Sequence, residues 1–447
     1  MFRRILVANR GEIAARVLRA CNELGVESVA IFSAADQNAP WLRLATKAVC
    51  IGPARAAESY LNADAVLQVA RQENCQAVHP GYGFLSENSI FAARCAEQGL
   101  TFVGPSAVAI QRMGDKAAAK RTMADHGLPT IPGSDGVVSD LEDVKRIAEE
   151  FGFPLLLKAS AGGGGKGMRR CDRKEDLQRA YDEARQEAEA AFGNGALYVE
   201  KLIEGGRHIE FQVLCDRFGK GVHLGERDCS IQRKNQKLIE ESPSPVMDAA
   251  TRDKMGRRVA AAVSAAGYSN AGTVEFLRDP SGSLYFMEIN ARLQVEHPVT
   301  EMVTGVDLVQ QQLRVAANEP LSFSQDSVTI EGHAIEFRIN AERVEHDFAP
   351  DPGEISRFVE PLLSADVRWD SAVEEGYRIP PWYDSMIGKL IVRGSDRGDA
   401  IARAKDILSS MILEGVETTI PLHRRLLEDE QFVSGDYNLN RLEQVLA

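Results

Sequence analysis

Two glutamates and an asparagine on a predicted hairpin are well suited to holding a metal ion. Apolar segments flank the turn Asp279-Pro-Ser-Gly-Ser, a pattern typical of two antiparallel strands. If the turn is centred between Ser281 and Gly282, Glu275 lies opposite Glu288, and Asn290 projects from the same face. Facing carboxylates repel unless a proton or a cation lies between them, and Mg²⁺ takes such oxygen ligands. The alternative is a solvated polar face of a sheet.

The same alternation continues through three more polar residues. Arg292, Gln294 and Glu296 recur at two-residue spacing, so a single strand would project them from one face. The strand is predicted to end at His297-Pro298. A rigid guanidinium suits a planar oxyanion such as bicarbonate, carboxylate or phosphate, and Glu296 could act as a general base. An exposed salt-bridge ladder is the alternative, but continuity with the predicted metal site favours chemistry.

A run of four glycines predicts a phosphate-binding loop. Residues 161–167 read Ala-Gly-Gly-Gly-Gly-Lys-Gly and follow an apolar segment that ends in Lys158. Glycines let backbone N–H groups approach phosphate oxygens without an intervening Cβ, and Lys158 and Lys166 add positive charge. The spacing differs from G-x-x-x-x-G-K-[ST], so a P-loop is excluded. A surface turn is the alternative for the glycines alone.

Two further basic sites suit an anionic substrate. Residues 232–237 read Gln-Arg-Lys-Asn-Gln-Lys, which is a basic patch in an acidic chain. Residues 333–340 alternate between polar and apolar, which puts Glu336 and Arg338 on one face of a predicted strand. The alternatives, a solvated loop for the patch and a surface salt bridge for Arg338, stay open.

The elements that must position these side chains follow an α/β pattern. Residues 4–8 and 28–32 are apolar and flank a helical periodicity over 12–24, which predicts a βαβ unit of a parallel sheet. The alternation continues at 77–79 and 100–103. The first turn, Ala-Asn-Arg-Gly-Glu, lacks G-x-G-x-x-G, so we expect a Rossmann-like sheet that does not bind a dinucleotide.

The chain of 447 residues is long enough for about three domains. Prolines and glycines near residue 130 mark a linker, and the chain becomes strand-rich after about residue 205. We therefore expect four segments, namely an N-terminal Rossmann-like domain (1–113), a connecting helical segment (114–130), a lid domain bearing the glycine loop (131–203) and a C-terminal mixed α/β domain (204–447).

The composition is that of an ordinary globular protein, with 44% hydrophobic and 26% charged residues. The net charge of −13 disfavours broad binding to nucleic acid or anionic membranes, but not a local basic pocket. No apolar stretch approaches the roughly 20 residues of a membrane span, and the apolar N-terminal run is too short for a signal peptide. The 7 scattered cysteines include no C-x-x-C pair, which predicts free thiols and a cytoplasmic protein.

Longer motifs resemble the ATP-grasp superfamily and, within it, the biotin carboxylase family. The first resemblance rests on Phe153-Pro-Leu-Leu-Leu-Lys-Ala-Ser-Ala-Gly-Gly-Gly-Gly-Lys-Gly and Glu288-Ile-Asn-Ala-Arg-Leu-Gln-Val-Glu-His-Pro. The closer one rests on motifs that begin at Ala8 (Ala-Asn-Arg-Gly-Glu-Ile-Ala), His79 (His-Pro-Gly-Tyr-Gly-Phe-Leu-Ser-Glu-Asn), Met113 (Met-Gly-Asp-Lys), Glu226 (Glu-Arg-Asp-Cys-Ser-Ile-Gln-Arg), Gln294 (Gln-Val-Glu-His-Pro-Val-Thr-Glu-Met) and Pro380 (Pro-Pro-Trp-Tyr-Asp-Ser-Met-Ile-Gly-Lys-Leu). The resemblance implies an ATP-grasp fold, α/β and α+β, with a Rossmann-like parallel-sheet domain, a mobile glycine-loop lid and a C-terminal domain that completes the site.

The resemblance also implies an activity, the ATP- and bicarbonate-dependent carboxylation of biotin through carboxyphosphate. The residues that would bind ATP are Lys116, Lys158, Gly164, Gly165, Lys166, Glu200, Lys201, Ile203, His208, Gln232, Asn235 and Leu277. Of these, Glu200, Lys201 and Ile203 would hold the adenine. Mg²⁺ or Mn²⁺ would be held by Glu275, Glu288 and Asn290. Bicarbonate would be bound by Lys237, Arg292, Gln294, Val295 and Glu296. The catalytic set would be Lys237, Arg292, Glu296 as the base, and Arg338, which would stabilise the enolate-like oxygen of biotin.

Partners follow from the same resemblance. The chain contains no Met-Lys-Met biotin attachment sequence, so the biotin carboxyl carrier protein and the carboxyltransferase are expected on other chains. That carboxyltransferase would choose the acyl acceptor, such as acetyl-CoA in fatty acid biosynthesis, propionyl-CoA, pyruvate or 2-oxoglutarate. Arg16, Arg19 and Glu23 resemble the family's dimer-forming residues and predict a homodimer, with a solvated helix face as the alternative.

One residue departs from the family pattern. Asn235 stands where the family usually has His, and Asn can donate and accept hydrogen bonds but cannot become cationic. The departure bears on ATP affinity rather than on the reaction class. Two other functions remain as alternatives: another ATP-grasp carboxylate or carbamate ligase, and a non-catalytic regulatory protein that binds ATP. The presence of Lys237, Arg292 and Glu296 disfavours the regulatory protein.

Overall fold

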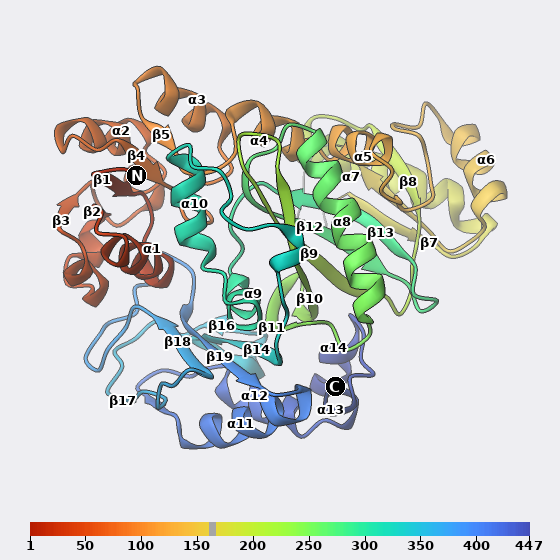
Figure 1. Cartoon of the computed structure of the whole chain (residues 1–447). Helices are drawn as coiled ribbons and strands as arrows, with labels where there is room; N and C mark the ends of the chain where they lie inside the picture. Colours follow the sequence, from red (N-terminus) through yellow and green to blue (C-terminus); the bar gives the residue numbers. More distant parts are fainter. Residues whose placement is uncertain (161–166) are drawn as a thin grey trace. The chain divides into compact units, whose positions relative to one another are not determined.

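The computed structural model describes residues 1–160 and 167–447 (Figure 1). The chain divides into two compact units. The larger unit comprises residues 1–114, 209–275 and 289–447, and the smaller unit comprises 115–208 and 276–288. Throughout these described ranges, no helix has both the length and the apolar character needed to span a bilayer. The cysteines are free thiols, as their spacing predicts.

The larger unit begins with a five-stranded parallel sheet in the order β3-β2-β1-β4-β5. Its strands are β1 (Arg4–Val7), β2 (Glu27–Phe32), β3 (Lys47–Cys50), β4 (Ala77–His79) and β5 (Thr101–Phe102). The accompanying helices are α1 (Gly11–Glu23), α2 (Ala63–Gln72), α3 (Ser89–Glu97) and α4 (Ala107–Gly114). The apolar face of α1 packs in a core with residues of β1, so the predicted βαβ unit and Rossmann-like sheet are confirmed.

A second sheet has eight strands in the order β13-β12-β9-β10-β11-β14-β19-β18. These strands are β9 (Arg207–Cys215), β10 (Gly221–Arg233), β11 (Gln236–Ser242), β12 (Asn270–Arg278), β13 (Leu284–Asn290), β14 (His333–Asn340), β18 (Val367–Ser371) and β19 (Met386–Gly394). The chain passes between the two units within β9, β12 and β13. The predicted hairpin is confirmed, because β12 and β13 are neighbours and the Asp279 N–H donates to the Ser283 oxygen across the turn.

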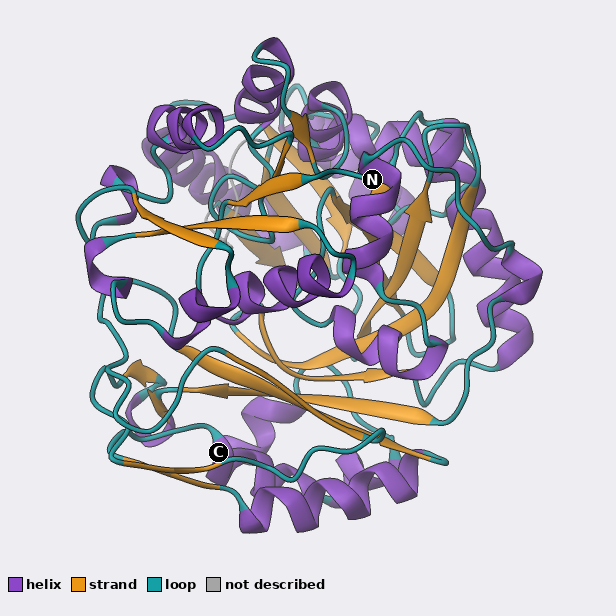
Figure 2. Ribbon diagram, turned by 60° about the vertical axis from the view of Figure 1, so that its left-hand side comes forward, coloured by secondary structure: helices purple, strands orange, loops and turns teal. Residues whose placement is uncertain are grey.

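Helices cover both faces of the β14–β19 part of this sheet. On one face, Phe337 and Leu390 pack in a core with α11 (Arg397–Ser410) and α12 (Ile420–Leu427), which lie beside these strands in Figures 1 and 2. On the other face, Ala334 and Ile391 pack against α9 (His297–Thr304). Glu336 and Arg338 alternate with the apolar residues of β14 and share the face of Ala334, so they lie on the side of the sheet that α9 covers.

Shorter elements complete the larger unit. Its other helices are α8 (Ala249–Ala265), α10 (Leu308–Ala316), α13 (Glu430–Ser434) and α14 (Arg441–Leu446). Two small antiparallel pairs join β15 (Glu342–Arg343) to β16 (Ala349–Pro350) and β17 (Arg357–Val359) to β20 (Ile412–Glu414).

The smaller unit contains a three-stranded antiparallel sheet in the order β7-β6-β8. Its elements are α5 (Lys116–Asp125), α6 (Leu141–Phe151), β6 (Leu155–Ala159), β7 (Met168–Cys171), α7 (Leu177–Phe192) and β8 (Leu197–Lys201). Leu155, Leu157 and Val199 form a core with the apolar faces of α6 and α7. The segment boundaries 1–113, 114–130, 131–203 and 204–447 remain a prediction.

Candidate active site

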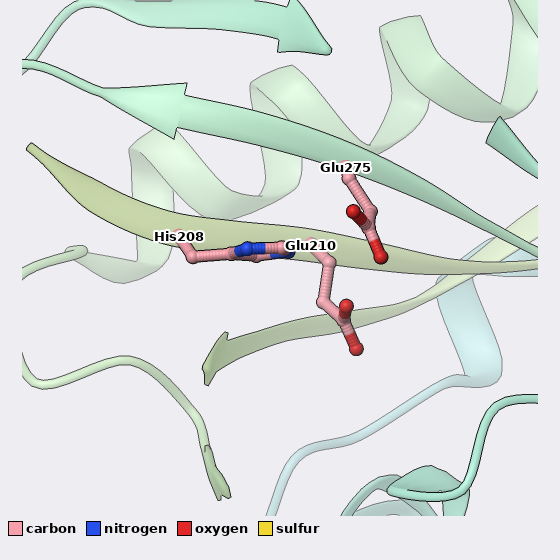
Figure 3. Close-up of side chains that lie close together, drawn as sticks. All are labelled: His208, Glu210 and Glu275. Carbon is pink, nitrogen blue, oxygen red and sulfur yellow. The ribbon is translucent and has the colours of Figure 1, made fainter. Parts of the chain in front are cut away.

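The larger unit gathers three carboxylates around the ammonium of Lys237. Its Nζ lies 2.5 Å from Glu210 Oε2, 2.6 Å from Glu296 Oε1 and 3.2 Å from Glu275 Oε1. Burial alone would lower the pKa of Lys237, but the three carboxylates outweigh it and raise that pKa well above its ordinary value. Figure 3 shows Glu210 and Glu275 on the neighbouring strands β9 and β12, with His208 two residues before Glu210. Lys237 is therefore a permanent positive charge.

Glu296 joins Lys237 to a second cation. Its Oε2 accepts a hydrogen bond of 2.9 Å from Arg338 Nη2, and Arg338 Nε donates to Glu240 Oε1 at 2.6 Å. Burial opposes the charge of Arg338, but Glu240, Glu296 and Glu336 outweigh it and raise its pKa. Each oxygen of the fully buried Glu296 thus accepts from a different cation. Such a carboxylate is fixed in place and able to accept a proton.

Arg292 is held by three side chains of the larger unit. Its Nε donates to Glu87 at 2.9 Å, its Nη1 to Gln294 Oε1 at 2.8 Å and its Nη2 to Asn290 Oδ1 at 3.2 Å. Glu87 precedes α3 and also accepts from the Ala291 N–H. These contacts orient the planar guanidinium, which suits it to a planar anion.

The predicted metal ligands are divided between the two units. In the larger unit, Glu275 Oε1 accepts a hydrogen bond of 2.8 Å from Asn290 Nδ2. In the smaller unit, Glu288 Oε2 lies 2.9 Å from Lys116 Nζ. Carboxylate and amide oxygens are the hard donors that Mg²⁺ and Mn²⁺ take, so the chemistry of the three side chains fits such an ion. The direct pairing of Glu275 with Glu288 remains a prediction.

The smaller unit holds two lysines on one buried carboxylate. Lys158 on β6 and Lys120 on α5 lie 2.7 and 2.9 Å from the two oxygens of Glu200 on β8. Burial would raise the pKa of Glu200, but the two lysines outweigh it and lower that pKa. Both oxygens of Glu200 are therefore occupied by lysines, and Lys201 Nζ donates to the Phe153 oxygen at 2.6 Å. The arrangement provides clustered positive charge next to the glycine segment of the sequence.

The remaining predicted ATP residues lie in varied surroundings. Gly164, Gly165 and Lys166 lie outside the described residues. His208 is buried on β9, while Ile203 and Leu277 are half-buried.

The continuous strand predicted through Glu296 is wrong. Strand β13 ends at Asn290, residues 291–296 form a turn, and α9 begins at His297 with Glu296 as its N-cap. Pro298 occupies the first turn of α9, where its missing N–H has no helical partner to lose. Arg292 therefore reaches the site from a turn and Glu296 from the N-terminus of a helix. Strand alternation does not bring them together. The positive end of the helix dipole also favours the carboxylate of Glu296.

The basic patch at 232–237 is a tight hairpin between β10 and β11, in which Arg233 pairs with Gln236. Lys234 and Asn235 form the two-residue turn with φ values of 48° and 67°, the left-handed conformation that Asn adopts more readily than most residues. Asn235 is exposed at this turn, whereas Gln232 is buried and donates to the Cys229 oxygen at 3.2 Å. The hairpin turn thus gives Asn235 a conformational reason to stand at this position.

Several residues of the site were absent from the sequence-based predictions. Glu210 could have been found, because it lies on the same face of β9 as His208 and alternates with apolar residues. The sequence around the other four residues contains no pattern that indicates a role in the site, because their roles arise from contacts with residues distant in the sequence. These residues are Glu87, Lys120, Glu240 and Lys389.

Comparisons with known proteins identify the family of this chain. Three family models match the chain: "Biotin carboxylase, N-terminal domain" over residues 1–110, "Carbamoyl-phosphate synthase L chain, ATP binding domain" over 115–324, and "Biotin carboxylase C-terminal domain" over 336–444. Biotin carboxylase 1 of Bacillus subtilis is 52% identical over 444 residues, covering 99% of this chain and 98% of that protein. The 2-oxoglutarate carboxylase small subunit of Hydrogenobacter thermophilus is 49% identical, covering 99% of this chain and 94% of that protein.

Solved structures show the same similarity. The biotin carboxylase domain dimer of Hydrogenobacter thermophilus 2-oxoglutarate carboxylase, in complex with MgADP, ADP and bicarbonate, superposes with a TM-score of 0.93 at 48% identity. That alignment covers 100% of this chain and 99% of the other. Biotin carboxylase from Campylobacter jejuni, in a β,γ-ATP complex, gives a TM-score of 0.94 at 46% identity, with 99% of each chain covered. The chain therefore belongs to the biotin carboxylase family.

Proposed function

We propose that this chain is an ATP-dependent ligase that carboxylates biotin on a separate carrier protein. The products would be carboxybiotin, ADP and phosphate. The observation that carries the proposal is the buried carboxylate of Glu296, held between Lys237 and Arg338. A base fixed between two cations suits a reaction in which a small anion must lose a proton and its dianion must be stabilised.

The first step would activate bicarbonate. Bicarbonate is a poor nucleophile, so Glu296 would remove its proton and allow an oxygen to attack the γ-phosphorus of ATP. Arg292, already oriented by its three side-chain partners, would hold the planar anion, and Lys237 would offset its growing negative charge. The γ-phosphoryl bond to ADP breaks as the bond to the bicarbonate oxygen forms, which gives carboxyphosphate.

The second step would transfer the carboxyl group to biotin. Carboxyphosphate would release CO₂ and phosphate, and phosphate would take the N1′ proton of biotin as N1′ attacks CO₂. The ureido oxygen then becomes enolate-like, and Arg338 would stabilise it. Arg338 faces Glu296 and Glu240 before the reaction, so protonation of Glu296 removes one of its counter-charges and makes the guanidinium more attractive to the enolate.

ATP would be bound chiefly by the lysines of the smaller unit. Lys116 and Lys158 would contact its phosphates together with the backbone of the glycine loop. Glu275, Glu288 and Asn290 would hold Mg²⁺ or Mn²⁺, which would neutralise charge on the phosphates.

The proposal includes partners and a location. The carrier and the carboxyltransferase would be separate chains, and the enzyme would act in the cytoplasm.

We also propose a homodimer, because Leu362 and Leu363 are 89% and 57% exposed in one loop of the larger unit. The predicted dimer residue Arg16 is instead buried against Glu301 and Asp307 of the same chain, while Glu23 stays exposed.

The first test is ADP release from Mg-ATP by the purified chain, with and without bicarbonate and free biotin. We expect a bicarbonate-dependent rate that biotin raises, with [¹⁴C]carboxybiotin formed in proportion. A bicarbonate-independent rate that responds to another carboxylate would indicate a different ATP-grasp ligase. ATP binding with no turnover, even with biotinylated carrier protein, would indicate a regulatory protein.

A further inference from the structure

The turn at 291–296 has left the sheet, so its backbone carbonyls must find partners outside a strand ladder. Three of these carbonyl oxygens lie within hydrogen-bond distance of side-chain nitrogens. The Leu293 oxygen accepts from Arg292 at 3.2 Å, the Gln294 oxygen lies 2.7 Å from His297 Nδ1, and the Val295 oxygen accepts from Lys389 Nζ at 2.8 Å. Arg292 and His297 belong to the same local segment. Lys389, on β19, is the only one of these three donors that lies far from the turn in the sequence.

Lys389 is an unusual residue for its position. It lies in the middle of β19 with a side chain that is 0% exposed, and burying an ammonium is costly unless it is paired and hydrogen-bonded. Its Nζ lies 3.2 Å from Glu12 Oε2 on α1 and 5.9 Å from the centre of the Tyr82 ring. An apolar residue would fill this strand position without that cost, so the ammonium is explained best by what it contacts.

The Val295 carbonyl shares a planar peptide unit with the N–H of Glu296. The hydrogen bond from Lys389 therefore fixes the peptide plane from which the Glu296 side chain departs. We propose that Lys389 is a positioning residue for the catalytic base, acting through the Val295 carbonyl rather than by touching a substrate. This inference rests on the proposed function, because it assumes that Glu296 is the base.

Glu12 forms the ion pair with Lys389, and the buried carboxylates Glu336 and Asp370 also interact with the ammonium. Burial raises the pKa of Glu12, Lys389 opposes that rise, and Glu12 accepts a hydrogen bond from the Tyr82 hydroxyl. Removing Lys389 alone would leave a buried carboxylate without its cation, which would destabilise the fold for reasons unrelated to positioning. Changing both residues to neutral side chains of similar length removes this charge from Glu12, while Glu336 and Asp370 keep the nearby charges of Arg338 and Arg368.

The test compares Glu12→Gln/Lys389→Met with Glu12→Gln as the matched control. The double variant lacks the bond to Val295, whereas the control keeps it. We expect kcat/KM for bicarbonate to fall by about 10- to 100-fold in the double variant, because a displacement of the base by about 1 Å is enough for such a loss. The KM for ATP should stay within about twofold of the wild type, since no ATP residue is moved. The control should remain within about threefold of the wild type for both substrates, because its Lys389 still interacts with Glu336 and Asp370 and still donates to Val295.

Hydrogen exchange supplies a readout that does not depend on activity. Amides within 291–297 should exchange faster in the double variant than in the control, while those of β14 should not change. Unaltered exchange and unaltered bicarbonate kinetics in the double variant would overturn the positioning role. A wild type without bicarbonate-dependent turnover would instead refute the proposed function, and exchange would still decide whether Lys389 orders the turn. If the double variant does not fold, Lys389→Met alone is measured in the same way.

Discussion

Replacing Glu296 with Gln tests the proposed base most directly. The substitution keeps the size of the side chain but turns one carboxylate oxygen into an NH₂ group. Because the two oxygens accept from Lys237 and Arg338, whichever cation faces the NH₂ loses its acceptor and meets a donor. The site would therefore lose both a proton acceptor and one charge-assisted contact.

The size of each effect follows from the geometry. Loss of a positioned general base lowers kcat by about 10²- to 10⁴-fold. Removing one partner of a buried ion pair costs about 3–5 kcal/mol, but here Lys237 keeps Glu210 and Glu275, and Arg338 keeps Glu240. We therefore expect a stability loss of about 1–3 kcal/mol, the value of a single hydrogen bond to a charged group. ATP affinity should change little, because Glu296 is not among the residues assigned to ATP.

Glu301→Gln is the matched control for Glu296→Gln. Glu301 lies on the same helix, α9, is also buried, and likewise accepts from two cations, Arg16 at 2.9 Å and Arg368 at 2.6 Å. It has no assigned part in the reaction. Its replacement should cost comparable stability and leave bicarbonate-dependent turnover within about threefold of the wild type.

The assay measures ADP release at saturating Mg-ATP and bicarbonate, with denaturant unfolding and ATP binding measured on the same preparations. Full turnover by Glu296→Gln would remove Glu296 from the role of base. An equal loss of turnover in Glu301→Gln would also refute the reasoning, because destabilisation alone would then account for both variants.

Four further predictions follow. Lys158→Gln should weaken ATP binding about 10- to 100-fold in calorimetry, because a charge-assisted contact to phosphate is lost. Chelating the divalent cation should abolish bicarbonate-dependent ADP release, and added Mg²⁺ should restore it. Leu362→Asp/Leu363→Asp should shift the protein from dimer to monomer in sedimentation velocity, without changing its circular dichroism. Burial lowers the pKa of His423 from 6.5 to about 4, so the folded state binds fewer protons than the unfolded state between these values. Stability should therefore fall as the pH drops from 6.5 to 4, and His423→Gln should remove up to about 3 kcal/mol of that loss in denaturant unfolding.

Local patterns predicted the elements well where apolar periodicity alone determined them. The βαβ start, the hairpin around Asp279 and the strand at 333–340 all form as expected. The prediction failed at 291–296, where polar and apolar residues still alternate but the chain turns into α9. Pro298 was interpreted as the end of a strand, although proline is also common in the first turn of a helix. Alternation cannot distinguish these cases, because what stabilises the turn is a set of side-chain donors that includes the distant Lys389.

A solvated polar face was the alternative for the alternating strands, and on β9 and β14 the structure buries the polar face instead. All nine residues of β9 are buried, including His208 and Glu210 on its polar face. On β14 the polar residues Glu336 and Arg338 lie beneath α9. A polar face that is buried must pair its charges internally, so the alternation that indicates an amphipathic strand in a typical sheet marks the reactive centre here.

The result of this pairing is a row of charges that alternate in sign: Glu210, Lys237, Glu296, Arg338 and Glu240. The proposed base stands at the centre of this row, and each flanking cation has another carboxylate on its far side. When Glu296 takes a proton, neither Lys237 nor Arg338 is left as an unpaired buried charge, because Glu210 and Glu240 remain ionic partners. The same two cations have then lost one counter-charge each, so their positive potential toward a bound anion increases at the moment when negative charge has passed to the substrate. If Lys237 and Arg338 had no carboxylate other than Glu296, protonation of Glu296 would leave both of them unpaired, which explains why the outer Glu210 and Glu240 belong to the site although they need not touch a substrate.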